Sequence, residues 1–335
     1  MTPVSIVTGF LGSGKTTLIG RLLRDPSMAR TAVIVNEFGE IGIDHHLIAS
    51  SDETLLALTT GCLCCAVRGD LVDTLLNLAQ RRLDGTADFD RVLIETSGLA
   101  DPAPILHALM TDPAIGEIYA LDTVITLVDS QHGGRTLADH PEARRQAALA
   151  DLLAFSKTDI ATPDDALRDD LLALNQTAPI TNVLLLTVND LFRASDARER
   201  AVRLTRLPDH PKGNPFTQAR HGEVVESFVL ERETPLPALA LTMLLEALTE
   251  HAGTHLLRVK GLIDIAEMPG RPALLHGVRH VFSPPEFLER WPTGVSTTRI
   301  VFITHRMPHH FPARLLAAIE AEVADALAQA TKSRV

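Results

Sequence analysis

Eight consecutive residues near the start of the chain have the types and spacing that bind phosphate. Residues 9–16 read Gly-Phe-Leu-Gly-Ser-Gly-Lys-Thr and fit the pattern G-x-x-x-x-G-K-[ST]. Glycines let the backbone wrap around phosphate oxygens, and N–H groups at a helix start favour anions. Lys15 would neutralise the β- and γ-phosphates, and the Thr16 hydroxyl would bind Mg²⁺. An apolar strand before this phosphate loop (residues 9–16) and a helical pattern after it predict a nucleotide site. Its candidate phosphate-binding residues are Gly9, Gly12, Ser13, Gly14, Lys15 and Thr16.

A second candidate segment lies at the end of a later apolar run. Glu95-Thr96-Ser97-Gly98 follows the expected strand 92–94. Nucleotide-binding proteins of this kind place an acidic residue there that holds the water shell of Mg²⁺, which is the role predicted for Glu95. The backbone N–H of Gly98 would then reach the γ-phosphate. Taken alone, the segment is also typical of a simple tight turn.

The nucleobase is predicted from a third segment. Ser156-Lys157-Thr158-Asp159 follows the expected strand 152–155 and is similar to the N-K-x-D element of GTP-binding proteins. A carboxylate at Asp159 can accept hydrogen bonds from guanine N1–H and from the 2-amino group, which adenine cannot satisfy. The stem of Lys157 would cover the base. The first position is Ser rather than Asn, so the pattern does not predict one contact near the N7/O6 edge. Lys157 and Asp159 favour GTP over ATP.

All three cysteines of the chain lie within four residues, at Cys62, Cys64 and Cys65. This is the opposite of a disulfide framework, in which pairs are spread along the chain. A C-x-C-C group can offer two or three thiolates to one soft or borderline ion such as Zn²⁺ or Cu(I). An open coordination position then suits a site that must release its metal. A buried apolar cluster and a redox sensor are the alternatives.

Composition and charge limit the class of protein. A chain of 335 residues with 45% hydrophobic residues predicts a globular protein of two domains. The net charge of −11 argues against nucleic acid and against an anionic membrane surface as partners. Apolar runs are too short to span a bilayer, and no leader is recognisable. With its clustered thiols, the chain is expected to be cytoplasmic.

The elements that must position these residues follow from the apolar pattern. Continuous apolar runs, rather than alternating ones, indicate strands buried on both faces, which is typical of a mainly parallel sheet between helices. The expected strands cover residues 4–8, 32–35, 92–94, 124–128, 152–155 and 183–186.

A Pro-rich stretch near residue 207 predicts a linker, and the pattern changes after it. We expect a domain over residues 1–206, a linker over 207–222 and a smaller α+β domain over 223–335 with a mainly antiparallel sheet. Its expected strands cover residues 224–230, 256–265, 273–282 and 298–304, and its expected helices cover 236–248 and 311–329.

With the cysteine motif included, the chain resembles the CobW-type GTPases, relatives of the hydrogenase- and urease-maturation GTPases. The resemblance covers nearly the full chain and is looser in the second domain. It rests on the phosphate loop with its additional Thr17, residues 35–44 (Val-Asn-Glu-Phe-Gly-Glu-Ile-Gly-Ile-Asp), residues 61–65, residues 95–102, residues 156–159, residues 258–261 and residues 299–302.

The resemblance implies a P-loop NTPase domain, slow Mg²⁺-dependent GTP hydrolysis, and metal binding at the cysteine motif. The metal is zinc for most members and cobalt for some, and it is delivered to a metal-requiring client protein. Glu37 and Glu40 fall where a GTPase has a switch segment. Glu37 is therefore a candidate both as a catalytic residue and as an oxygen ligand of the transition metal, and a solvated surface loop is the alternative.

Three other functions share parts of this pattern. A small-molecule kinase would have the same phosphate loop but would use ATP. A regulatory GTPase with a structural zinc would hold its metal in every nucleotide state, and a redox-sensing switch would respond to peroxide. The physiological metal and the client stay open at this point, as does assembly into a homo-oligomer.

Overall fold

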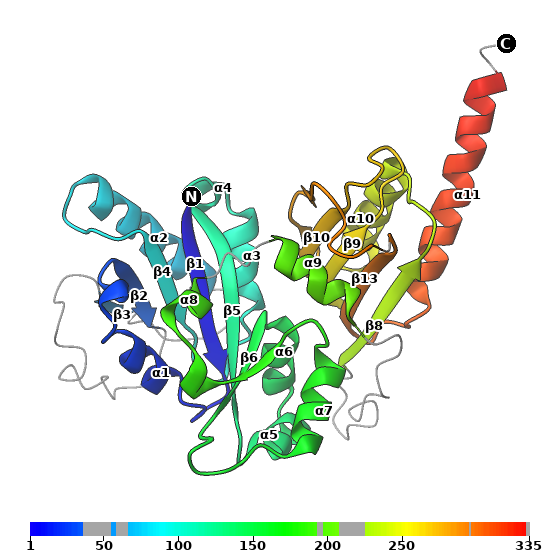
Figure 1. Cartoon of the computed structure of the whole chain (residues 1–335). Coiled ribbons are helices and arrows are strands. Elements are labelled where there is room, and N and C mark those ends of the chain that lie inside the picture. Colours follow the sequence, from blue (N-terminus) through cyan, green and yellow to red (C-terminus); the bar gives the residue numbers. More distant parts are fainter. Residues whose placement is uncertain (36–54, 58–65, 193–196, 208–224, 295, 333–335) are drawn as a thin grey trace. The chain divides into compact units, whose positions relative to one another are not determined.

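The chain folds into two compact units, Met1–Ala194 and Ser195–Val335. The computed structural model describes residues 1–35, 55–57, 66–192, 197–207, 225–294 and 296–332 (Figure 1). Each unit is built around its own sheet.

A seven-stranded sheet forms the centre of the first unit, and all of its strand pairs are parallel. The spatial order is β3-β2-β4-β1-β5-β6-β7. The strands are β1 (Thr2–Gly9), β2 (Thr31–Val35), β3 (Leu55–Ala57), β4 (Arg91–Glu95), β5 (Tyr119–Asp129), β6 (Leu152–Ser156) and β7 (Ile180–Asn182). The predicted fold class, a parallel sheet between helices, is confirmed. Because the strands are parallel, their carboxyl ends meet at one edge, where Glu95, Asp129 and Ser156 lie beside the turn that follows β1.

Helices cover both faces of this sheet (Figure 1). Along β5, Ile125 and Leu127 pack into the same apolar cluster as Leu18 of α1 and Leu191 of α8. Thr126, which points to the opposite face, donates to the backbone of α6. The helices are α1 (Lys15–Leu22), α2 (Ala66–Leu83), α3 (Ala103–Thr111), α4 (Pro113–Gly116), α5 (Gly133–Asp139), α6 (Pro141–Leu149), α7 (Asp165–Leu174) and α8 (Val188–Leu191), with short 3-10 helices η1 (Pro26–Met28) and η2 (Val183–Leu185).

The strand predicted over residues 183–186 is wrong. The last strand of the sheet is β7, and the apolar run after it forms η2. The side chain of Asn182 accepts a hydrogen bond from Leu184 N at 2.9 Å, and Leu184 and Leu185 are exposed. The local cap therefore overrides the apolar pattern, which by itself indicates a buried strand.

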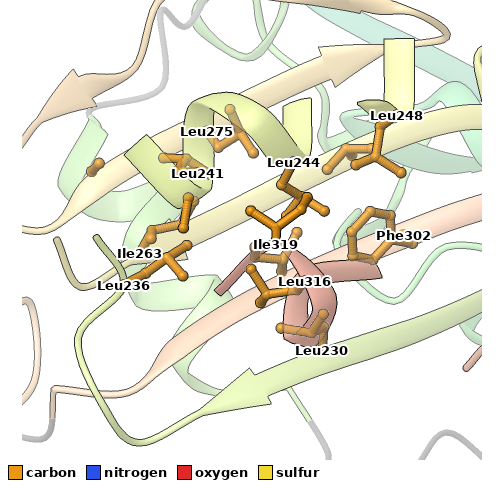
Figure 2. Close-up of a cluster of buried hydrophobic side chains, with 14 of the residues drawn as sticks. Leu230, Leu236, Leu241, Leu244, Leu248, Ile263, Leu275, Phe302, Leu316 and Ile319 are labelled. Carbon is orange, nitrogen blue, oxygen red and sulfur yellow. The ribbon is translucent and has the colours of Figure 1, made fainter. Parts of the chain in front are cut away.

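The second unit contains an antiparallel sheet in the order β11-β10-β9-β13-β8, with β12 paired to β10. Its elements are α9 (Ala197–Thr205), β8 (Val225–Arg232), α10 (Ala238–Ala252), β9 (Leu256–Ile263), β10 (Ala273–Val278), β11 (Val281–Phe282), β12 (Glu286–Phe287), β13 (Thr298–His305) and α11 (Phe311–Lys332). Figure 2 shows the core between the sheet and α10 and α11, where Leu244 and Leu316 meet Phe302.

Two details of the second unit differ from the sequence prediction. The single strand expected over residues 273–282 is a hairpin of β10 and β11, which turns at Arg279 with a left-handed φ of 52°. Helix α9 falls within residues 1–206, the predicted first domain, but it packs on the opposite face of the second sheet from α10 and α11. Its Leu204 lies in a cluster with Leu262 and Val301. The division between the units thus falls before α9 and not after residue 206, while residues 208–222 of the predicted linker lie outside the described residues.

In the part of the chain that the structure describes, no helix has the combined length and hydrophobicity that a bilayer span requires.

The hydroxyl of Tyr119, the one tyrosine of the chain, anchors α2 to the start of β5. It is fully buried and donates to Leu75 O at 2.9 Å. Burial raises the pKa of Tyr119 from 10.0 to about 12, and the charge of Arg82 offsets this only in part. The folded state therefore holds the proton more tightly than the unfolded state does. The contribution to stability is complete below pH 10 and is lost as the pH rises towards 12.

Replacing Tyr119 by Phe should therefore lower the free energy of unfolding by about 1 kcal/mol at neutral pH, because one buried hydrogen bond is lost. Urea unfolding followed by circular dichroism measures this cost. The difference between the two proteins should shrink above pH 10, and tyrosinate absorbance of the folded wild type should rise with a midpoint near 12. A midpoint near 10 in the folded protein would contradict the buried hydroxyl.

Candidate functional site

The phosphate loop is a turn that only glycine can build at its critical positions. Gly9, Gly12 and Gly14 have φ values of 143°, 70° and 88°, which are unfavourable for other residues. At Gly9 space is also lacking, since an added Cβ would lie 2.5 Å from Leu127 O. Helix α1 begins directly afterwards, at Lys15, with no acidic side chain in its first turn. The positive end of the helix is therefore available to an anion.

Lys15 folds back over this loop. Its Nζ donates to Gly9 O at 2.9 Å and to Phe10 O at 3.2 Å, and the residue is buried. The ammonium group is thus held inside the turn, where phosphate oxygens can replace carbonyl oxygens as its partners. Ser13 is oriented differently. Its hydroxyl is buried beside Gly9, and its backbone N–H donates to Phe10 O.

Thr16 and Glu95 meet beside Lys15. Thr16 Oγ1 donates to Glu95 Oε1 at 2.7 Å, and Thr16 itself is exposed while Glu95 is buried. The contact arises because β4 pairs in parallel with β1, with Val7 opposite Glu95. A hydroxyl and a carboxylate placed together at an anion site are the oxygen ligands that Mg²⁺ prefers, so this donor set fits the ion. Thr17 follows on α1 and is also exposed.

The turn after β4, which we name the Gly98 turn (residues 96–101), lies against the phosphate loop. Thr96 N donates to Val7 O at 3.0 Å, and Thr96 Oγ1 donates to Thr8 Oγ1 at 2.7 Å. A Cβ added at Gly98 would lie 2.7 Å from both N and Cα of Leu11. The two backbones therefore touch, and only glycine permits this approach.

The segment of residues 156–159 begins at the end of β6 and lies at the same edge of the sheet. A Cβ added at Gly14 would lie 3.9 Å from Ser156 Cβ, which places this segment next to the phosphate loop. Lys157 has a left-handed φ of 56°, and its Nζ forms an ion pair with Asp129 Oδ2 at 2.7 Å. Asp159 is exposed, so its carboxylate is available to a ligand.

Two residues that support this segment are not predicted from the sequence. Burial raises the pKa of Asp129, but hydrogen bonds from Lys157 and from the backbone N–H groups of Gln131 and His132 outweigh burial and hold the pKa below its usual value. Asn182 Oδ1 accepts from Thr158 Oγ1 at 3.0 Å. The only local signal is a polar side chain next to an apolar run, after residues 124–128 for Asp129 and before residues 183–186 for Asn182.

The predicted metal ligands Cys62, Cys64, Cys65 and Glu37 lie outside the described residues, as does Glu40. They fall between Val35, which ends β2 opposite Glu95, and Ala66, which begins α2. Among the side chains that the structure describes, no group of three or more His, Cys, Asp or Glu residues is arranged to hold a metal ion.

Two family models match the chain. Residues 3–182 match the CobW/HypB/UreG nucleotide-binding domain, and residues 225–321 match the cobalamin synthesis protein cobW C-terminal domain. Among curated relatives, the zinc chaperone YjiA of Escherichia coli is 32% identical over 313 residues, with 91% of this chain and 94% of the relative covered. The zinc chaperone CobW of Pseudomonas aeruginosa is 34% identical over 346 residues, covering 90% and 87%.

A solved structure is similar over both units. The Zn(II)-bound YjiA GTPase from E. coli superposes with a TM-score of 0.73 at 26% identity, covering 95% of this chain and 98% of that chain. A Zn(II)-bound triple mutant of YjiA, with one glutamate and two cysteines replaced by alanine, gives the same values.

The contact between Gly98 and Leu11 leads to a direct test. Gly98→Ala should force the two backbones apart and lower the affinity for a non-hydrolysable GTP analogue by about tenfold, with a stability cost of about 1–3 kcal/mol from overpacking. Fluorescence titration with a labelled analogue and urea unfolding measure the two effects.

Gly134→Ala in α5 is the matched control, because its added Cβ would meet no described side chain or packed segment within 4 Å beyond its chain neighbours and its own helix backbone. This variant should bind the analogue as the wild type does. If Gly98→Ala binds the analogue as tightly as Gly134→Ala does, nucleotide binding does not require the close approach of Leu11 and Gly98.

Proposed function

This chain belongs to the CobW/HypB/UreG family, and from this premise we propose that it is a GTP-hydrolysing metallochaperone that binds zinc at its cysteine motif and delivers it to a client protein. The observation that carries the nucleotide half of the proposal is the contact of Thr16 Oγ1 with Glu95 Oε1 at 2.7 Å, next in sequence to Lys15, whose ammonium is bound to carbonyls of the phosphate loop. These groups are what a Mg²⁺-bound triphosphate requires at one place. When bound there, Mg²⁺ would neutralise negative charge on the β- and γ-phosphates.

The arrangement at the sheet edge supports GTP as the nucleotide. In this proposal the exposed carboxylate of Asp159 accepts from guanine, and Lys157, oriented by Asp129, covers the base. Lys15 holds the phosphates from within the loop. The Gly98 N–H binds the γ-phosphate, and the proposed role of Glu37 is in hydrolysis or in metal binding.

The metal half rests on the residue types of Cys62, Cys64 and Cys65 and on the zinc chaperones among the relatives. In sequence, the cysteines lie between two regions that we propose contact the nucleotide, residues 37–44 and the Gly98 turn, with β3 before the cysteines and α2 and β4 after them. Ordering of either region by the γ-phosphate would change the thiolate geometry. By linkage, zinc must then change nucleotide affinity by the same factor.

A regulatory GTPase with a structural or redox-sensing thiolate site is the second candidate function, because it shares the same residues. The two differ in one measurable quantity. A carrier changes its zinc affinity with nucleotide state, whereas a structural site does not.

We expect zinc affinity to differ by about tenfold or more between nucleotide states, which corresponds to ~1.4 kcal/mol of coupling. The measurement is competition with a chromophoric chelator for the reduced protein in three forms: apo, GDP-bound, and bound to a non-hydrolysable GTP analogue with Mg²⁺. Identical affinity in all three forms would favour the regulatory GTPase.

Substitutions identify the residues that bind zinc and those that couple zinc affinity to the nucleotide. Since a YjiA mutant lacking two cysteines still binds Zn(II) in a crystal, the tightest site has to be separated from weaker ones by its stoichiometry. Cys64→Ala with Cys65→Ala should remove the tightest site, while the exposed pair His309→Ala with His310→Ala should leave it intact. Lys15→Ala should keep zinc affinity in the apo form and lose its dependence on nucleotide.

The guanine assignment has its own test. Asp159→Asn should weaken GTP binding by about tenfold to a hundredfold, because hydrogen bonds to a charged acceptor are lost. Affinity for xanthosine triphosphate should rise, since xanthine carries a carbonyl where guanine carries its 2-amino group, and Asn can donate to it. The exposed Asp165→Asn on α7 is the control. If Asp159→Asn keeps the wild-type preference for GTP over xanthosine triphosphate, Asp159 does not contact the base.

A further inference from the structure

Helix α6 carries a buried amide that holds the Gly98 turn. Gln146 is fully buried, and its Nε2 donates to Gly98 O at 3.1 Å and to Ala100 O at 3.0 Å. Both N–H bonds of the amide are therefore used by two carbonyls of one turn, 48 and 46 residues away in sequence. The opposite orientation of the amide would place its oxygen against two carbonyl oxygens, so the chemistry of the partners determines the orientation.

The helix that presents this amide is itself held firmly. Thr126 Oγ1 of β5 donates to Gln146 O at 2.8 Å. At the end of the helix, Asn175 Nδ2 donates to the carbonyls of Ala147, Ala148 and Ala150 at 2.9–3.1 Å. Gln146 therefore works from a rigid support, and rigid supports give the most accurate positioning of a functional group.

The same helix reaches the turn and the phosphate loop at further points. Arg145 pairs with Asp101 Oδ2 at 3.7 Å, and Asp101 Oδ1 accepts from Ala103 N at 2.9 Å. At the start of α6, the ring of His140 lies 4.4 Å from the ring of Phe10 in the phosphate loop. Residues 140–146 thus contact both of the segments that meet at Gly98 and Leu11.

Without such a support, the Gly98 turn would have wide rotational freedom. Glycine has the largest accessible φ/ψ range of any residue, and the peptide N–H that would meet a γ-phosphate is set by the torsions at this residue. The contact with Leu11 limits the turn on one side. The Gly98 N–H lies in the peptide from Ser97 to Gly98, and Gly98 O lies in the next peptide. Gln146 holds that next peptide while Leu11 limits the space at the Gly98 Cα, so the torsions that join the two peptides are restrained.

We propose that Gln146 is the positioning residue of the Gly98 turn, which sets the preference for GTP over GDP and the rate of hydrolysis without touching the nucleotide. The proposal rests on the proposed function, in which Gly98 binds the γ-phosphate. GDP has no γ-phosphate, so the effect of Gln146 is confined to the triphosphate.

The test replaces Gln146 by Met, which has a similar length but no hydrogen-bond donor. We expect affinity for GDP within twofold of the wild type, affinity for a non-hydrolysable GTP analogue lower by about tenfold, and a lower kcat. Fluorescence titration with both nucleotides and steady-state hydrolysis provide these values. Equal loss for GDP and the GTP analogue, or no loss for either, would overturn the proposal.

Two further variants keep the test decisive. Tyr119→Phe also removes one buried hydrogen bond, but at the opposite end of β5, so it controls for lost stability and should leave the ratio of the two affinities unchanged. Arg145→Met removes the second attachment at a partly exposed position, and it should shift the ratio in the same direction by a smaller factor even if Gln146→Met does not fold. A wild-type protein that binds no guanine nucleotide would contradict the proposed function instead, and this outcome is separate from a variant that behaves as the wild type.

Discussion

The arrangement of the first unit depends on the parallel pairing of β1 with β4. This pairing places Val7 opposite Glu95, so β4 ends two residues before β1 ends at Gly9, and the turns that follow the two strands share one space. The shared space is small, since the backbones of Gly98 and Leu11 are in contact. In every parallel sheet the carboxyl ends of the strands lie along one edge. The residues at these ends determine what this edge can bind.

The charged side chains at this edge, Lys15 and Asp129, are held in place by hydrogen bonds within the protein. The ammonium of Lys15 is buried but solvated by loop carbonyls, which reduces the cost of removing it from water. The carboxylate of Asp129 stays ionised because Lys157 and two backbone N–H groups stabilise it. In the proposed function, phosphate oxygens would replace the carbonyl partners of Lys15. Such preorganisation is the condition under which a charged site binds a polyanion well even in a chain of net charge −11.

Buried amides connect this edge to the rest of the unit. Gln146 and Asn175 both bind backbone carbonyls in sets, Gln146 at the Gly98 turn and Asn175 at the end of α6. Each joins segments that are distant in sequence, and each would leave several acceptors without a donor if it were lost, which is costly inside a protein. The second unit uses a different principle, because its sheet is held between α10 and α11 on one face and α9 on the other mainly by apolar packing (Figure 2).

The sequence alone determined the fold class, the phosphate loop and the positions of Glu95 and Lys157, because these depend on local patterns of apolar runs and turn residues. The cysteine motif is predicted from its clustered thiols and Glu37 from the family resemblance, and both lie outside the described residues. Only the tertiary structure decided that residues 183–185 form a 3-10 helix capped by Asn182, that a hairpin turns at Arg279, and that α9 belongs to the second unit. It also showed the roles of Asp129 and Gln146. Neither a buried amide nor a strand-end carboxylate indicates its distant partner in the sequence, since these partners lie 46 or more residues away for Gln146 and 28 residues away, at Lys157, for Asp129. Such contacts exist only after the sheet has brought the strand ends together.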